Sequence, residues 1–222
     1  MKVLVLGGSG LIGRAVVTEL VNSRYEVLAL NRSEPAADSL RQLGANVLSG
    51  DLFAPQDWAT AVTRVEAIIQ LATTFTDDAG AVEQKMFTAL TQTLAAAKSK
   101  MRLIYTGGVW LYGATGDNPA DDSAAAGTPF HPIADFAWAV NNGKALLASP
   151  QFSTAVNHPA MVYHQTGDAF ARYIARAQDH SPIEIWGSGA TRWPLVHRDD
   201  LAIAYRLLLE QPILTGYFNT SA

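Results

Sequence analysis

The chain has 222 residues, of which 49% are hydrophobic and 16% charged, and its formal net charge is -4. This composition is typical of a compact globular protein, and it lacks the basic excess that nucleic acids or anionic membrane surfaces attract. The absence of cysteine excludes disulfides, thiolate metal ligands and cysteine nucleophiles. With no signal-peptide pattern and no long apolar run, we expect one cytoplasmic domain, 1–222, with no metal and no nucleic-acid or membrane partner.

Short apolar runs alternate along the chain with amphipathic stretches. Continuous runs of apolar residues are typical of strands that are buried on both faces of a sheet. We predict strands at 3–6, 27–30, 46–48, 67–71, 103–105, 154–156 and 216–219. Because helical stretches separate these strands, the predicted fold class is α/β, with a doubly wound parallel sheet and helices on both faces.

Three glycines follow the first predicted strand. The stretch LGGSGLIG places Gly7, Gly10 and Gly13 between that strand and the next helix, with Leu11 and Ile12 between the last two glycines. A turn of this kind lets a pyrophosphate approach the backbone and the free N–H groups of a helix N-terminus. We therefore predict that these five residues contact a dinucleotide.

The end of the second strand bears on the choice of dinucleotide. An acidic residue there would bond the adenosine ribose hydroxyls, but this sequence has Asn31, Arg32 and Ser33. An arginine holds a 2′-phosphate through charge-assisted hydrogen bonds, whereas a carboxylate repels it. NADP is therefore the predicted cofactor and NAD the alternative, with Asn31 and Arg32 as contacts. The competing interpretation makes Arg32 a solvated surface residue.

Asp51 and Leu52 follow the third predicted strand, directly after Gly50. An aspartate at such a strand end either accepts a hydrogen bond from the adenine amino group or caps the next helix. Both interpretations are open at this point.

The stretch 79–97 is the clearest helix candidate. Its apolar residues recur every four positions and form one stripe, which consists of Val82, Met86, Leu90 and Leu94. We interpret the stripe as a packing surface, either in the core or in a homodimer. The helices at 79–97 and 135–148 are therefore candidates for a homodimer contact.

Two later segments complete the predicted elements. The loop 113–132 is rich in Gly, Ala, Asp and Pro, and long loops of this kind often cover binding sites. After Gly187 the sequence predicts a turn and then a helix with Asp199 and Asp200 in or near its first turn.

Several motifs occur together in a fixed order. After the glycine turn come GDL at 50–52, QLAT at 70–73, YTGGVWLYG at 105–113, HPAMVYH at 158–164 and WPLVHRDDLA at 193–202. With these motifs the chain resembles the extended and atypical short-chain dehydrogenases/reductases, the NAD(P)-dependent epimerase/dehydratase-like family. The resemblance implies a Rossmann-type fold. Because little sequence follows Ala202, it also implies a reduced C-terminal substrate lobe, with substrate-side segments at about 113–134 and 163–196.

The resemblance also implies cofactor contacts beyond the glycine turn. These residues lie at the carboxyl ends of the predicted strands and would contact the adenine, the ribose or the nicotinamide. They are Asp51, Leu52, Leu71, Ala72, Thr73, Thr106 and Pro159.

The catalytic positions of the family are altered in this sequence. Relatives place a Ser or Thr four residues before the tyrosine of the YG turn, and counting back from Tyr112 gives Gly108, with Gly107 beside it. Thr106 is the nearest hydroxyl. Relatives also carry a Tyr-x-x-x-Lys pair on the next long helix. If Lys144 is that lysine, Val140 stands at the tyrosine position.

A second register is open as well. In it Phe136 and Val140 replace the pair, and Lys144 occupies a later position. Both registers lack the tyrosine, and the loss of a general acid typically costs about 10²- to 10⁴-fold in rate. Lys144, Thr106 and Tyr112 are the candidate catalytic residues. Further candidates for a substitute acid are Tyr163, His131 and His164, and all of them have a competing interpretation as packing or surface residues.

Three other features have structural interpretations. His158 replaces the arginine that the family has before its proline, and His197 precedes two acidic residues at a predicted helix start, where a polar cluster is the simpler interpretation. The tryptophans form either an aromatic wall over the nicotinamide or ordinary packing contacts; they are Trp110, Trp138, Trp186 and Trp193.

Two functions from different classes fit these observations. The first is an NADP(H)-dependent oxidoreductase or sugar-epimerase relative with a degenerate Ser/Tyr/Lys site, acting on an unknown small molecule. The second is a non-catalytic, NADP(H)-sensing regulatory protein. The cofactor turn fits both functions, and the missing serine and tyrosine leave the choice between them open.

Overall fold

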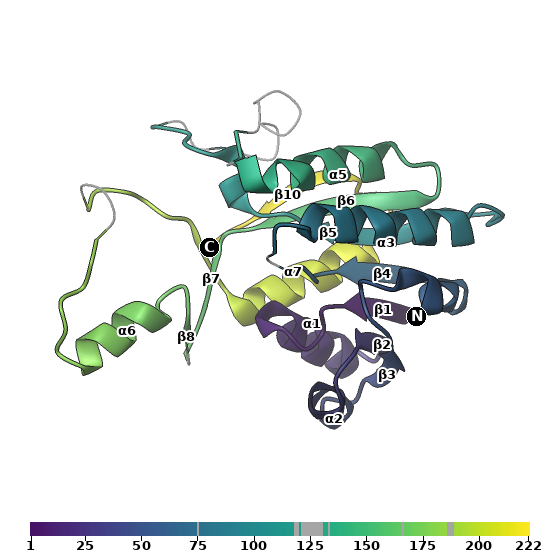
Figure 1. Ribbon diagram of the computed structural model, residues 1–222, viewed down its shortest axis with the longest axis horizontal. Helices are drawn as coiled ribbons and strands as arrows, with labels where there is room; N and C mark the ends of the chain where they lie inside the picture. The colour runs from purple at the N-terminus through teal and green to yellow at the C-terminus, as the bar shows by residue number, and fades with distance from the viewer. Residues whose placement is uncertain (75, 118–119, 121–130, 133, 166, 186–188) are drawn as a thin grey trace.

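Seven parallel strands form the central sheet of the computed structural model, which describes residues 1–222 except 75, 118–119, 121–130, 133, 166 and 186–188 (Figure 1). The sheet order is β10-β6-β5-β4-β1-β2-β3. The strands are β1 (Lys2–Leu6), β2 (Glu26–Asn31), β3 (Asn46–Ser49), β4 (Ala67–Gln70), β5 (Met101–Thr106), β6 (Phe152–Pro159) and β10 (Gly216–Thr220). All seven predicted strands are present, with ends that differ by up to three residues, and the predicted doubly wound α/β fold is confirmed.

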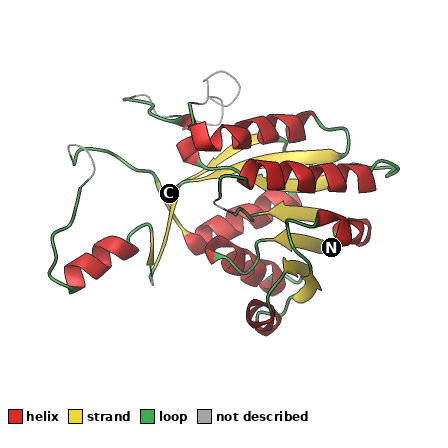
Figure 2. Cartoon of the chain, viewed as in Figure 1, coloured by secondary structure: helices red, strands yellow, loops and turns green. Residues whose placement is uncertain are grey.

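Helices cover both faces of this sheet (Figures 1 and 2). On one face, α1 (Leu11–Asn22) packs against α7 (Arg198–Glu210), and their apolar sides share a core with β1 and β2. On the other face, α3 (Ala79–Thr93) and α5 (Ala137–Ala148) close a second core over β4 and β5. The helix α2 (Glu34–Gln42) lies beside β2 and β3, and short 3-10 turns complete the body at Pro55–Asp57, Ala59–Arg64, Val109–Tyr112 and Ala134–Phe136.

The helix predicted at 79–97 is shorter than expected. It ends at Thr93, because the backbone N–H groups of Ala95 and Ala97 turn back to Gln92 and Leu94, which reverses the chain toward β5. The apolar stripe of this helix is buried against its own sheet, so the stripe is core packing and does not supply a dimer surface.

A smaller sheet lies outside the central one, in the order β8-β7-β9. It consists of β7 (Met161–His164), β8 (Gly167–Asp168) and β9 (Leu195–His197), and α6 (Ala171–Gln178) follows β8. Figure 2 shows α6 standing away from the central sheet, and none of its residues is buried. The predicted substrate-side segment 163–196 contains the end of β7, all of β8, the start of β9 and α6, which was not predicted.

The strand order reverses at β1, which pairs with β2 on one side and β4 on the other. In open α/β sheets, ligands bind at the carboxyl ends of the strands beside such a reversal. No helix in the described part of the chain has the length and apolar character needed to cross a membrane.

Candidate functional site

The turn between β1 and α1 brings the backbone closer to its neighbours than side chains permit. Gly7 has a φ of 85°, and a Cβ atom there would lie 2.7 Å from the backbone nitrogen of Ala72. A Cβ atom on Gly13 would lie 2.0 Å from the carbonyl oxygen of Gly7. On Gly10 the nearest atom would be the same oxygen at 3.4 Å, so the fold tolerates a side chain there. Gly7 and Gly13 are required by the fold, and Gly10 leaves the surface of the turn open.

The N-terminus of α1 begins at this open surface. Gly10 is the N-cap, no side chain bonds to the cap, and the first turn contains no acidic residue. Leu11 is exposed and Ile12 is partly buried. The positive end of the helix dipole and the N–H groups of the first turn form an arrangement that binds phosphate.

Arg32 lies at the end of β2 with an exposed side chain. Its Nη1 is 3.6 Å from Oδ2 of Asp51, and Asn31 beside it donates a hydrogen bond to the carbonyl oxygen of Ser33. An exposed ion pair contributes about 0–1 kcal/mol, so Arg32 can exchange Asp51 for another anion at little cost.

Asp51 closes the turn that follows β3. Its Oδ1 accepts from the backbone N–H of Phe53 at 3.0 Å, and its carbonyl oxygen accepts from Nε1 of Trp58 at 2.8 Å. The N-cap of the next short helix is Ala54, so the interpretation of Asp51 as that cap is wrong. Contact of Asp51 and Leu52 with adenine stays a prediction.

Gln70 fixes the loop after β4. Its Nε2 donates to the carbonyl oxygen of Ala72 at 2.9 Å, and its Oε1 accepts from the backbone N–H of Ala72 at 3.2 Å. This clamp holds the loop of Leu71, Ala72 and Thr73 beside Gly7. A small pocket adjoins it, and Leu52, Ala72 and Thr73 are among its lining residues.

A buried carboxylate connects this loop to two other elements. Glu83 of α3 is 7% exposed and accepts from Nε2 of Gln70 at 3.0 Å, from Oη of Tyr105 at 2.9 Å and from Nδ2 of Asn142 at 2.9 Å. Burial raises the pKa of Glu83 above its usual value of 4.5, although the three donors oppose the shift. The carboxyl group therefore joins α3, β4, β5 and α5 beside the loop of Leu71, Ala72 and Thr73.

We predict a pH-dependent contribution of Glu83 to stability. Because its folded-state pKa lies above the unfolded value, the contribution is fully present below about pH 4.5 and is lost as pH rises through the folded-state value. The Glu83→Gln variant has no ionisable group at this position. Its free energy of unfolding should therefore increase relative to that of the wild type as pH rises through this range. Urea denaturation at a series of pH values measures the difference. Glu184→Gln, at an exposed position, should show no such trend, and parallel curves for Glu83→Gln and wild type would contradict the prediction.

The two hydroxyls predicted near the β5 tip are both engaged. Oγ1 of Thr106 lies 2.7 Å from Oη of Tyr205, which is fully buried in α7. Tyr112 is 3% exposed and donates to Oδ1 of Asn219 in β10 at 2.9 Å. Both groups stabilise the strand tip in this arrangement.

The double glycine of the β5 tip and His158 depend on each other. His158 is 1% exposed, its Nδ1 accepts from the backbone N–H of Gly108 at 2.9 Å, and its ring stacks on Tyr217. A Cβ atom on Gly107 would lie 2.4 Å from that Nδ1. Burial lowers the pKa of His158 to about 4, so the ring is neutral at pH 7. Two departures from the family pattern thus form one packed unit.

The helix α5 places apolar residues where the catalytic pair was sought. Val140 is buried and packs in a small cluster with Leu111 and partly buried Phe136. Lys144 is exposed one turn further along, and Pro159 is buried at the end of β6. Of the remaining acid candidates, His131 is exposed, whereas Tyr163 and His164 lie partly buried in β7. Trp186 and part of the loop 113–134 lie outside the described residues.

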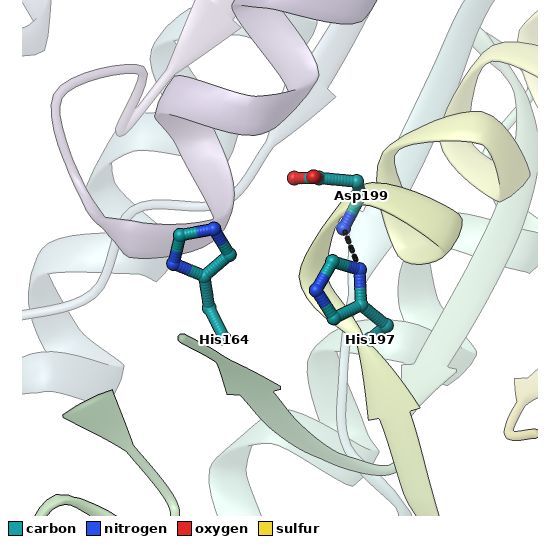
Figure 3. A group of neighbouring side chains, drawn as sticks. All are labelled: His164, His197 and Asp199. Atoms are coloured by element: carbon teal, nitrogen blue, oxygen red, sulfur yellow. Dashed lines mark hydrogen bonds between the residues drawn. The ribbon is translucent and has the colours of Figure 1, made fainter. Parts of the chain in front are cut away.

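His164, His197 and Asp199 approach one another at the start of α7 (Figure 3). One nitrogen or oxygen from each lies within 4.8 Å of the others. Nδ1 of His197 accepts from the backbone N–H of Asp199 at 3.3 Å and caps the helix. The Arg198 guanidinium lies 3.0 Å from Nε2 of His164 and donates to Asp199 at 3.1 Å. The cation among these groups is therefore the guanidinium of Arg198. This arrangement agrees with the interpretation of a structural polar cluster.

The buried hydrogen-bond network of Glu83 and Gln70 was not predicted from the sequence. Glu83 adjoins the apolar stripe of α3, one position after Val82, and an acidic residue on the flank of a buried stripe was the available signal. Its partners Tyr105 and Asn142 come from distant segments, so the network is visible only in three dimensions.

Comparison with known proteins shows which family the chain matches. Residues 3–216 match the family described as the NAD dependent epimerase/dehydratase family. The protein YLL056C of Saccharomyces cerevisiae is 30% identical over 222 residues, which cover 95% of this chain and 71% of that protein. The decarboxylating sterol-4-alpha-carboxylate 3-dehydrogenase of Dictyostelium discoideum is 28% identical over 164 residues, covering 69% of this chain but only 48% of that enzyme. The chain thus spans about half the length of that relative.

Solved structures show the same fold at lower identity. The dTDP-glucose 4,6-dehydratase of Bacillus anthracis, in complex with NAD, superposes with a TM-score of 0.82 at 16% identity, over all of this chain and 75% of that one. The UDP-glucose 4-epimerase of Bifidobacterium longum, in complex with NAD+ and UDP, gives a TM-score of 0.74 at 17% identity, over all of this chain and 78% of that one. Because the family profile covers nearly all of the sequence, the chain belongs to the NAD dependent epimerase/dehydratase family.

Proposed function

We propose that the chain binds NADP(H) at the β1–β4 reversal and acts as an oxidoreductase or sugar-epimerase relative with an altered proton-transfer site. The observation that carries the proposal is the open glycine turn with the uncapped N-terminus of α1. Gly10 leaves this surface accessible although the fold does not demand a glycine there. A pyrophosphate that needs backbone N–H groups explains that choice.

The preference for NADP(H) over NAD(H) rests on Arg32. Its side chain is 69% exposed, and the only ion pair it makes among the described residues is the long contact with Asp51. An adenosine 2′-phosphate offers the guanidinium a stronger, charge-assisted partner. Asn31, Asp51, Leu52, Leu71, Ala72 and Thr73 complete the proposed adenosine side of the site.

The proposed chemistry differs from that of relatives with a complete triad. A bound nicotinamide dinucleotide supplies or accepts a hydride. In this chain the hydroxyl of Thr106 is shared with Tyr205 and that of Tyr112 is donated to Asn219, so neither is poised to move a proton in this arrangement. Lys144 is exposed on α5 and has an apolar residue, Val140, one turn before it. A ligand carbonyl at this site therefore lacks the tyrosine acid that relatives with a complete triad supply.

A second candidate function is the non-catalytic NADP(H) sensor. The apolar cluster of Leu111, Ala139 and Val140 favours it, because these residues pack where a proton donor is otherwise expected. The sensor and the enzyme share the cofactor site and differ only in turnover.

For the assembly, we propose a homodimer through the outer faces of α3 and α5. A groove runs between these helices, and Phe87, Thr88, Asn142 and Ala145 are among its lining residues. This groove lies apart from the buried stripe of α3. The single cytoplasmic domain expected from the sequence is part of the same proposal.

Fluorescence titration with NADPH and with NADH tests the function. We expect tighter binding of NADPH, followed by turnover on some member of a panel of aldehydes, ketones and quinones. Tight NADPH binding without turnover on the panel would select the sensor function instead. If neither nucleotide binds, both candidate functions fail.

A further inference from the structure

Trp110 lies directly over the β5 tip. Gly108 has a φ of 173°, an extended conformation that any residue adopts, so its backbone does not require glycine. The requirement is one of space, because a Cβ atom on Gly108 would lie 2.0 Å from Nε1 of Trp110 and 2.6 Å from Cδ1. The glycine therefore makes room for the indole N–H at the carboxyl end of the strand, where ligands bind in this type of sheet.

The indole is held in place, and the residue is partly exposed. Its ring packs edge-on against Phe136, with 4.5 Å between ring centroids and 70° between the planes. The residue is 43% exposed, and the hydrogen bonds of the described residues include none from its Nε1. Trp58 shows the contrast, because it is 2% exposed and its Nε1 donates to the carbonyl oxygen of Asp51. A positioned N–H donor at the carboxyl end of a strand in such a sheet is suited to bind an acceptor.

We propose that the indole N–H of Trp110 donates a hydrogen bond to a carbonyl oxygen of the ligand that binds over Gly107 and Gly108. The inference rests on the proposed function, since the carbonyl has to lie beside a nicotinamide. Trp110 then takes the place of the hydroxyl that the sequence lacks at Gly108. The indole nitrogen can lie beside Gly108 only because this residue has no side chain, so the missing hydroxyl and the position of the new donor have the same structural cause.

The chemistry of an indole restricts the class of ligand. The N–H group only donates, so it polarises a carbonyl but transfers no proton to it. Ligands whose reduced form is a stabilised anion suit such a site, and quinones are the simplest of them. A hydride from the reduced dinucleotide converts the quinone to a hydroquinone anion, and water then supplies the proton. The dinucleotide is oxidised as the quinone is reduced, so electrons and protons balance.

The indole signal provides a test that needs no turnover. The chain has five tryptophans, and ¹⁵N-labelled protein shows their indole N–H groups as separate NMR signals. Trp110→Phe identifies the signal of Trp110. With saturating NADP+, which cannot reduce a quinone, titration with duroquinone should shift this signal downfield and leave that of the buried Trp58 in place.

Variants test the same contact by affinity. Trp110→Phe keeps the ring against Phe136 and removes the donor, so duroquinone binding should weaken about 10-fold, the effect of one hydrogen bond. Gly108→Ala keeps the tryptophan and displaces its indole, so it should weaken binding similarly. Ile213→Ala, at an exposed apolar residue that precedes the amino end of β10, is the control. The affinity for NADP+ should change in none of these variants.

The outcomes separate this inference from the proposed function. Unchanged duroquinone affinity in Trp110→Phe, an unmoved Trp110 signal, or no duroquinone binding to NADP+-saturated protein would each overturn the role of Trp110 while leaving the cofactor site intact. Failure of NADP+ to bind would instead refute the proposed function. Duroquinone titration of the dinucleotide-free protein, followed by the same signal, then decides whether Trp110 contacts the carbonyl.

Discussion

Replacement of Gly13 by alanine is expected to abolish dinucleotide binding and to destabilise the fold by about 3 kcal/mol, the upper range for an overpacked core position. The new Cβ atom would lie 2.0 Å from the carbonyl oxygen of Gly7 and 2.8 Å from Cα of Gly8. Both are backbone atoms, so no side-chain rotation relieves the contact. The turn has to move away from α1, and the N–H groups that we propose as pyrophosphate contacts move with it.

Gly143 provides a matched control for this prediction. It also lies within a helix, α5, but a Cβ atom there would meet its nearest neighbours at 3.8–3.9 Å, an ordinary contact distance. Gly143→Ala should therefore stabilise the protein by about 0.5–1 kcal/mol, the helix preference of alanine over glycine. Urea denaturation and NADPH titration measure both variants. A Gly13→Ala protein as stable as the wild type, with unchanged NADPH affinity, would refute the geometry of the turn.

The Arg32→Glu variant is expected to weaken NADPH binding about 100-fold, through loss of a charge-assisted contact and added repulsion of the phosphate. NADH lacks the 2′-phosphate, so its affinity should be nearly unchanged. Stability should also be nearly unchanged, because the exposed ion pair of Arg32 with Asp51 contributes little. Fluorescence titration with both nucleotides gives the ratio of affinities.

Arg64→Glu controls for the change in net charge. Arg64 is exposed at the end of a short helix on a different part of the surface, and its substitution alters the total charge by the same amount. It should leave both affinities unchanged. If Arg32→Glu weakened NADPH and NADH equally, Arg32 would not be the 2′-phosphate contact, and its interpretation as a solvated surface residue would stand.

Most of the fold could be predicted from local patterns. Continuous apolar runs identified the five inner strands of the central sheet because those strands are largely buried, whereas the edge strands β3 and β10 contain no buried residue. The end of α3 was misplaced because Ala95 and Ala97 favour a helix, whereas the tight turn toward β5 decides their conformation. The helix α6 was missed; it has only eight residues, and none of them is buried.

At the altered catalytic positions, too, one part of the arrangement could be predicted from the sequence and another part could not. The sequence alone indicates that Gly108 and His158 depart from the family pattern. Only the structure shows that Gly107 accommodates the His158 ring and that Gly108 accommodates the Trp110 indole. A search for a substitute hydroxyl therefore directed attention to Thr106 and Tyr112, whose partners belong to α7 and β10.

The sequence by itself determined the order of strands and helices, the glycine turn at Gly7–Gly13 and the arginine at the end of the second strand, because these depend on neighbouring residues. Tertiary structure decided which glycines the fold requires, which three donors bind the buried carboxylate of Glu83, and which side chain fills the space beside Gly108 at the β5 tip. The physical reason is distance along the chain. Gly7 meets Ala72, and Glu83 meets Asn142, only after the sheet has assembled, and no local pattern records such contacts.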